Sequence, residues 1–247
     1  MSSDSPLSRR QFARVCASAL ALVGINPGLL AQTGGTLKHY QRVPLFDAND
    51  KPVTPADVKV GENYIFYYPY VATPCFLLNL GVPTTAHAEL RTEDGNHYRW
   101  NGGVGPGRSI VAFSAICAHR MSHPAPNVSF INYRHAPASF RRDDGTQAKQ
   151  ARVIYCCSEN SVYDPAQGAR VLGGPAKQPL AAIQLEQDGD GRLYAVGTVG
   201  GELFDRFFRE FSSRLALEHR THNLRQLVSD KASVIPLAEY CRNQVLC

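Results

Sequence analysis

Short apolar runs, separated by turn-forming residues, recur along the middle of the chain. Runs of about four to eight residues with such boundaries are typical of β-strands. The pair Asp94-Gly95 and the run 188–191 (Asp-Gly-Asp-Gly) predict hairpin turns between consecutive strands. Many short strands at regular spacing predict an all-β fold, a sandwich or a barrel. The expected strands cover residues 64–70, 75–80, 87–91, 97–100, 109–116, 151–155, 181–187 and 193–198.

The pattern changes after Gly201, where apolar residues recur at helical spacing. Residues 202–217 place Leu203, Phe207, Phe211 and Leu215 on one face, which predicts an amphipathic helix. Shorter helices are expected near residues 222–229 and 236–245, whereas the polar stretch 32–55 is expected to be irregular. We interpret residues 201–247 as a helical C-terminal extension that packs on the β domain.

The N-terminus carries an arginine pair ahead of an apolar stretch. Residues 8–12 read Ser-Arg-Arg-Gln-Phe, and residues 15–30 are mostly apolar. This pattern is typical of a twin-arginine export signal, and the alternative is an ordinary basic terminus. We therefore expect residues 1–31 to be a signal or anchor, either cleaved near Ala31 or retained at a membrane, and the protein to be periplasmic. No later segment approaches the run of about 20 apolar residues that a membrane span needs.

Composition excludes several classes of function. The net charge of +5 is small and scattered over 247 residues, which argues against a nucleic-acid partner. No nucleophile-and-base motif and no phosphate-binding glycine loop is present. Any chemical function must therefore depend on side chains outside these motifs.

Two short motifs carry that chemistry. Cys117-Ala118-His119 follows one expected strand, and Cys156-Cys157-Ser158-Glu159 follows another. Thiolates bind iron strongly, and imidazole on one iron of a [2Fe–2S] cluster raises its reduction potential. A cluster held by two loops needs two ligands from each, and the candidate metal ligands are Cys117, His119, Cys156 and Glu159.

Residues 101–198 resemble a Rieske [2Fe–2S] domain, most closely the small Rieske subunit of arsenite oxidases. The resemblance is carried by the Cys117–His119 motif, Tyr163-Asp164 and the runs 102–106, 110–114 and 173–176. It implies an antiparallel β-sandwich over 32–200, with an inserted cluster-binding subdomain at about 115–180. It also implies that Gly173, Gly174 and Pro175 form a loop over the cluster. Its functional implication is one-electron transfer with a redox partner or a larger catalytic subunit.

The chain departs from the Rieske pattern in three places. Ser122 and Ser158 stand where cytochrome bc-type Rieske proteins have a disulfide between the two cluster loops. His119 and Cys156 are separated by 36 residues, more than the family ordinarily has, and the excess at 123–150 is basic and aromatic. It is either a docking loop for a partner subunit or simply a longer loop. The third departure is Glu159, where the family has histidine.

Glu159 leaves three alternatives open. It ligates iron itself, which adds a negative charge and lowers the potential. Otherwise Cys157, His123 or His135 supplies the fourth ligand, or no cluster is bound and the protein is a structural or interaction subunit.

Two further expectations follow from the leader and from the remaining cysteines. A Rieske ferredoxin that feeds an oxygenase is disfavoured, since such proteins lack an export leader. In an oxidising compartment Cys241 and Cys247 could pair across a short loop, or both could stay as thiols.

Overall fold

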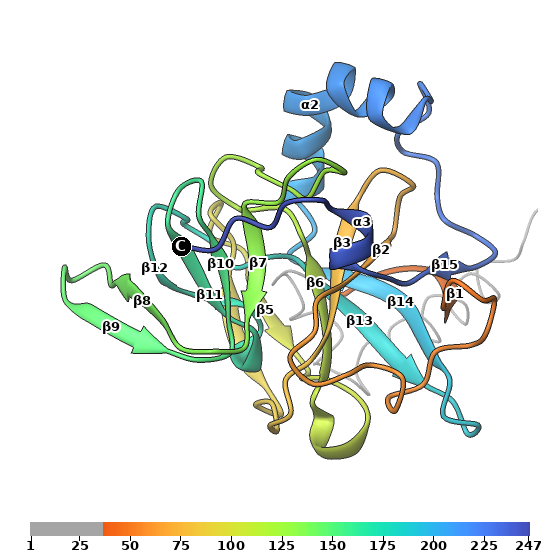
Figure 1. Ribbon diagram of the computed structural model, residues 1–247, viewed down its shortest axis with the longest axis horizontal. Helices are drawn as coiled ribbons and strands as arrows, with labels where there is room; N and C mark the ends of the chain where they lie inside the picture. Colours follow the sequence, from red (N-terminus) through yellow and green to blue (C-terminus); the bar gives the residue numbers. More distant parts are fainter. Residues whose placement is uncertain (1–36) are drawn as a thin grey trace, which may run out of the picture.

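A computed structural model describes residues 37–247 (Figure 1). The predicted leader at 1–31 lies outside the described residues. Within residues 37–247, no helix is both long and apolar enough to span a membrane. The strands are β1 (Lys38–Phe46), β2 (Tyr64–Tyr67), β3 (Pro74–Asn79), β4 (Ala88–Arg91), β5 (His97–Trp100), β6 (Ile110–Ser114), β7 (Ile131–Arg134), β8 (Ala138–Arg141), β9 (Gln147–Gln150), β10 (Val153–Cys156), β11 (Ser161–Asp164), β12 (Arg170–Gly173), β13 (Ala182–Gln187), β14 (Leu193–Val199), β15 (Ala232–Ser233) and β16 (Ile235–Pro236). The helices are α2 (Leu203–His219), α3 (Leu237–Tyr240) and the short 3₁₀ turns η2 (Pro106–Arg108) and η3 (Pro165–Gln167).

The strands form one large sheet and one small one, with two separate hairpins. The large sheet has eight strands in the order β15-β1-β14-β13-β6-β3-β2-β16, and the small sheet has four in the order β12-β11-β10-β7. Hairpins β4–β5 and β8–β9 complete the described strands. The predicted all-β architecture is confirmed, and so are the hairpin turns at 94–95 and 188–191.

The central strands of the large sheet send alternate side chains to two apolar clusters. In β3, Cys75 and Leu77 join the cluster that α2 covers, whereas Phe76 and Leu78 join the cluster that includes the small sheet. This period of two is the geometry of a strand buried on both faces. The large sheet is therefore the middle layer between α2 and the small sheet.

Helix α2 is an integral part of one cluster. It buries Leu203, Phe204, Phe207, Phe208 and Leu215, so the predicted helix and its apolar face are confirmed. The helix ends at His219, and the next residue, Arg220, caps it in a left-handed conformation.

Several expectations about the chain's flanks were wrong. Residues 38–46 form the nine-residue strand β1, although only Val43 and Leu45 are buried, so the apolar signal was weak. Residues 222–229 form turns and a bridge instead of a helix, because Tyr70 pairs with Leu227 and Val71 donates to Gln226. The final helix is confined to Leu237–Tyr240.

The insertion at 123–150 is built into the small sheet. Its strand β7 pairs with β10, and hairpin β8–β9 buries Ala138 and Phe140 against β10 and β11. The basic side chains Arg141 and Arg142 are exposed, and Phe130 is 39% exposed. The insertion is thus structured: β7 belongs to the small sheet, and the separate β8–β9 hairpin packs against that sheet.

The C-terminal tail crosses to the small sheet and ends beside β10 and β11 (Figure 1). Cys247 forms a disulfide with Cys157, and their Cα atoms are 5.7 Å apart. The pairing of Cys241 with Cys247 was therefore wrong. Cys241 is buried beside α3 and donates to the Asn243 carbonyl, while the tail carries Cys247 away along β7.

The packing of α2 predicts a large effect of one substitution. Phe207→Ala should lower the free energy of unfolding by about 3–5 kcal/mol, because the side chain is completely buried. Leu217→Ala is the matched control, since Leu217 on the same helix is 81% exposed and should change it by less than about 0.5 kcal/mol. Urea denaturation followed by circular dichroism measures both. Equal effects would show that α2 is not part of the core.

Candidate metal centre

Two loops bring the predicted site residues together. The first loop, residues 117–123, follows β6 by two residues and closes with a bond from the Cys117 amide to the Ser122 carbonyl (2.8 Å). The second loop, residues 156–160, is the turn of the β10–β11 hairpin, in which Cys156 pairs with Ser161. Each loop therefore leaves a buried strand, as the sequence predicted.

The two loops meet through buried thiols. Cys117 and Cys156 are completely buried. The facing Cys156 thiol lowers the pKa of Cys117 to about 6, although burial opposes this shift. The same interaction raises the pKa of Cys156, and burial adds to that effect. The two shifts have opposite directions because one contact between the thiols acts on both.

Tyr163 of β11 connects the loops. Its hydroxyl lies 3.4 Å from Cys117 Sγ and accepts a hydrogen bond from the Ala118 amide at 3.1 Å. Because that amide occupies an acceptor position of the hydroxyl, the hydroxyl proton is available to the sulfur. Burial raises the pKa of Tyr163, so the hydroxyl remains a donor.

His119 and Glu159 form a second pair. His119 Nδ1 lies 3.5 Å from Glu159 Oε2, and Arg120 Nη1 lies 3.9 Å from Glu159 Oε1. The side chains of His119 and Glu159 are 27% and 23% exposed, unlike the completely buried thiols. His119 Nδ1 itself is buried and has no hydrogen-bond partner among the described residues. This nitrogen is thus free to act as a ligand.

The four predicted ligands form two pairs instead of one group. Within residues 37–247, no group of three or more Cys, His, Asp and Glu side chains could hold a single metal ion. The thiols of Cys117 and Cys156 face each other, and the imidazole of His119 faces the carboxylate of Glu159. Such an arrangement supplies two ligands at each of two positions.

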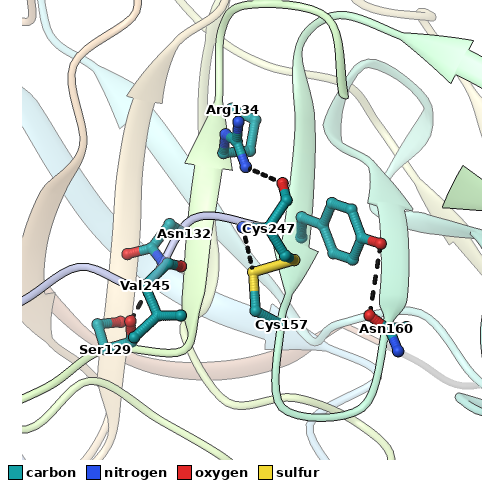
Figure 2. Close-up of a disulfide and its surroundings, with 8 residues drawn as sticks. Ser129, Asn132, Arg134, Cys157, Asn160, Val245 and Cys247 are labelled. Atoms are coloured by element: carbon teal, nitrogen blue, oxygen red, sulfur yellow. Dashed lines mark hydrogen bonds between the residues drawn. A yellow bond between two sulfur atoms is a disulfide. The ribbon is translucent and has the colours of Figure 1, made fainter. Parts of the chain in front are cut away.

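The other candidates for a fourth ligand are placed elsewhere. Cys157 is bonded to Cys247 (Figure 2). His123 is turned toward α2, with Nδ1 2.9 Å from the Met121 carbonyl and Nε2 3.6 Å from Glu218. His135 is exposed beyond the end of β7, with Nδ1 3.4 Å from the Tyr133 hydroxyl.

The predicted covering loop packs against the second loop. A Cβ atom on Gly174 would lie 2.2 Å from the Asn160 carbonyl oxygen, and its φ is +87°. A Cβ atom on Gly173 would lie 2.2 Å from the Arg141 carbonyl oxygen of β8. Pro175 is exposed. Only glycine fits at Gly173 and Gly174, where backbone approaches backbone closely.

Sequence reasoning missed three contacts of the loops. Tyr163 was noted only as part of a family pattern, although its place in the hairpin opposite Ile154 puts it beside the second loop. Arg206 of α2 donates to the His119 carbonyl at 2.8 Å, and the two residues are 87 positions apart. The disulfide partner of Cys247 was also missed, because Cys157 lies 90 positions away and spacing along the chain favoured the nearby Cys241.

No protein-family model matches the chain. Two curated proteins named iodate reductase subunit IdrB do match. The protein from Pseudomonas sp. (strain SCT) is 26% identical over 195 residues, 78% of this chain and 80% of the relative. The protein from Denitromonas iodatirespirans is 29% identical over 144 residues, 58% of each chain. This chain is thus similar in sequence to iodate reductase subunit IdrB.

A solved structure is also similar in part. This structure is the soluble domain of the Rieske protein II (soxF) from Sulfolobus acidocaldarius, which is 25% identical in sequence. The match covers 64% of this chain and 78% of the other, with a TM-score of 0.42. In this chain the first loop, with Cys117 and His119, follows β6 of the large sheet. The second loop, with Cys156 and Glu159, is the turn of the β10–β11 hairpin of the small sheet. The fold is mostly β, with a C-terminal helix, as the sequence predicted.

The contact between the first loop and α2 predicts a dependence of stability on pH. The neighbouring His123 imidazole lowers the pKa of Glu218, and Arg214 adds to this shift. Since the pKa in the folded state lies below that in the unfolded state, the contribution to stability is present above the usual range of glutamate and is lost as the pH falls through the depressed value. Glu218→Gln should therefore destabilise the protein by about 0.5–1 kcal/mol at neutral pH, and by less in acid.

The control for this prediction is a double-mutant cycle. In a His123→Gln background, Glu218→Gln should have a smaller effect on the free energy of unfolding at neutral pH. Urea titrations at several pH values provide the measurement. A penalty that is independent of both pH and His123 would contradict the predicted coupling.

Proposed function

We propose that this chain is a Rieske-type electron-transfer subunit of an oxidoreductase complex. The observation that carries the proposal is the pairing at the two loops. Two buried thiols face each other, and an imidazole with an unpartnered nitrogen faces a carboxylate. Two ligands for each iron are what a [2Fe–2S] cluster requires.

The donor set fits this cofactor in its chemistry. Cys117 and Cys156 would bind one iron, and His119 with Glu159 would bind the other. Thiolate and imidazole are ordinary ligands of such clusters, and carboxylate oxygen is an acceptable anionic ligand. When bound, the cluster would accept and release one electron at a time.

The surrounding residues have separate tasks. Tyr163 would donate its hydroxyl proton to Cys117 Sγ, and hydrogen bonds to sulfur raise the reduction potential of a cluster. Gly173 and Gly174 would keep the covering loop close to the second loop. His119 and Glu159 are the partly exposed ligands, so electrons would pass to a partner on their side.

The charge of Glu159 would set this centre apart from a centre with two imidazoles. A carboxylate in place of a neutral imidazole adds one negative charge and lowers the potential. Arg120 offsets part of that charge from 3.9 Å, but its side chain is 71% exposed and solvent weakens the effect. We therefore expect a potential below that of an ordinary Rieske centre.

The partner would be a larger catalytic subunit of a redox enzyme. The relatives are subunits of iodate reductase, which supports a role in a complex. The closer similarity to the arsenite oxidase small subunit stays a prediction. The arginine pair and apolar stretch at 8–30 support export by the twin-arginine route and a periplasmic location, with the leader cleaved or kept as an anchor.

The content of iron and acid-labile sulfide tests the proposal. Protein purified anaerobically should contain about two of each per chain. After reduction it should show the electron paramagnetic resonance signal of a [2Fe–2S] centre. The control is Cys117→Ala with Cys156→Ala, which should contain neither. Wild-type protein that is free of iron and sulfide would overturn the proposal.

Glu159→His tests ligation by the carboxylate. If Glu159 binds iron, the variant should keep its cluster and its potential should rise by on the order of 100 mV, because one negative charge is removed. Glu89→His is the control, since it changes the same charge on β4, outside both loops, and should leave the potential nearly unchanged. Redox titration followed by electron paramagnetic resonance measures both. An identical spectrum and potential in Glu159→His would exclude ligation.

The second candidate is a structural or interaction subunit without a cluster. The observation that favours it is the ion pair of Glu159 with Arg120 at 3.9 Å, which offsets the charge of the carboxylate without a metal. The buried His119 Nδ1, which has no hydrogen bond within residues 37–247, and the contact between two buried thiols favour the first candidate. The iron and sulfide measurement separates the two functions.

A further inference from the structure

The two loops have no covalent link to each other. Ser122 of the first loop and Ser158 of the second stand where the Rieske resemblance places a pair of cysteines. Tyr163 provides the side-chain contact described above between the loop regions. Each loop is instead held by a different part of residues 201–247.

Helix α2 holds the first loop through its backbone. Arg206 Nη2 donates to the His119 carbonyl at 2.8 Å, and Arg206 Nε donates to Glu210 at 2.8 Å. The arginine side chain is 35% exposed. A guanidinium held at both ends in this way fixes the carbonyl that lies next to a proposed ligand.

Helix α2 also holds the far end of the first loop. The His123 ring lies edge-on to Phe207 and Phe211, with ring centroids 4.9 Å and 5.5 Å apart. Its Nε2 lies 3.6 Å from Glu218, one residue before the end of the helix. The side chain is only 3% exposed, so this end of the loop is packed into the face of α2.

The C-terminal tail holds the second loop. Cys247 is bonded to Cys157, which immediately follows the proposed ligand Cys156 (Figure 2). The tail is also hydrogen-bonded along β7 and the segment before it. Its bonds are Ser129 amide to Asn243 carbonyl, Val245 amide to Ser129 carbonyl, Asn132 Nδ2 to Val245 carbonyl and Arg134 Nη1 to Cys247 carbonyl.

The helix and the tail meet at Tyr67 of β2. Its ring lies edge-on to His219 at the end of α2, with centroids 5.3 Å apart. Its hydroxyl lies 2.8 Å from the hydroxyl of Tyr240 in α3. The segments that hold the two loops are therefore anchored at one point on the large sheet.

We infer that residues 201–247 position both loops as a clamp, in place of a disulfide between the loops. Arg206 and the Cys157–Cys247 bond are the positioning groups, one for each loop. The inference rests on the proposed function for its effect on a cluster. Its effect on the loops themselves is independent of whether a cluster is bound.

Hydrogen exchange of the full-length purified protein tests the clamp. Cys247→Ser should speed exchange of the amides in residues 157–161 by on the order of tenfold, because the loop loses its covalent tie. Cys241→Ser is the matched control, since Cys241 lies in the same tail without a disulfide. If the variant does not fold, the disulfide of the wild-type protein can be reduced with a phosphine instead. Exchange of residues 157–161 should then become faster to the same extent.

A second pair of variants tests the contact of α2 with the first loop. Arg206→Ala should speed exchange in residues 117–123 on a similar scale and shift the electron paramagnetic resonance g values of the reduced cluster. Arg209→Ala, an exposed arginine on the same helix, should do neither. Release of iron to a chelator should be on the order of tenfold faster in Cys247→Ser and Arg206→Ala than in their controls.

These outcomes separate the inference from the proposed function. Wild-type protein without iron would overturn the proposed function, and the exchange rates would still decide the clamp. Unchanged exchange of 157–161 after loss of the disulfide would overturn the clamp, even in protein with a full cluster. Peptide mapping that finds Cys157 and Cys247 as free thiols in protein from the periplasm would overturn it as well.

Discussion

The contact of Tyr163 with the first loop is the interaction on which the site depends. The tyrosine belongs to the hairpin that carries the second loop, yet its hydroxyl accepts from the Ala118 amide and lies 3.4 Å from Cys117 Sγ. The residue is completely buried, so an unpaired hydroxyl there would be costly. The two loops therefore keep a fixed relation only while the small sheet stays packed on the large one.

Residues 201–247 contribute no proposed ligand, yet their packing on the large sheet affects the two loops. Helix α2 packs phenylalanines against one face of the large sheet. It contacts the first loop where Arg206 donates to the His119 carbonyl and where Phe207 packs against His123. The tail then passes β7 and bonds to the second loop through Cys247. One segment, residues 201–247, thus supplies both buried core residues and the contacts to the two loops.

The two pairs of proposed ligands differ in their exposure to solvent. The thiols are completely buried, and the Tyr163 hydroxyl lies 3.4 Å from Cys117 Sγ. The imidazole and the carboxylate are partly exposed, and Arg120 lies near the carboxylate. If the proposed function holds, a redox partner would approach the partly exposed side of the site, where His119 and Glu159 lie.

The sequence by itself determined five strands of the large sheet (β2, β3, β6, β13 and β14), the apolar face of α2 and the two loop motifs, because local periodicity and turn residues encode them. Strand β1 and the insertion strands β7, β8 and β9 were missed, since β1 buries only two side chains and the insertion strands have four residues each, about half of them polar. Only the tertiary structure decided that Cys247 bonds to Cys157 and that Arg206 reaches His119. These residues are 90 and 87 positions apart, and contacts at such separations depend on how the layers pack, which no local pattern records.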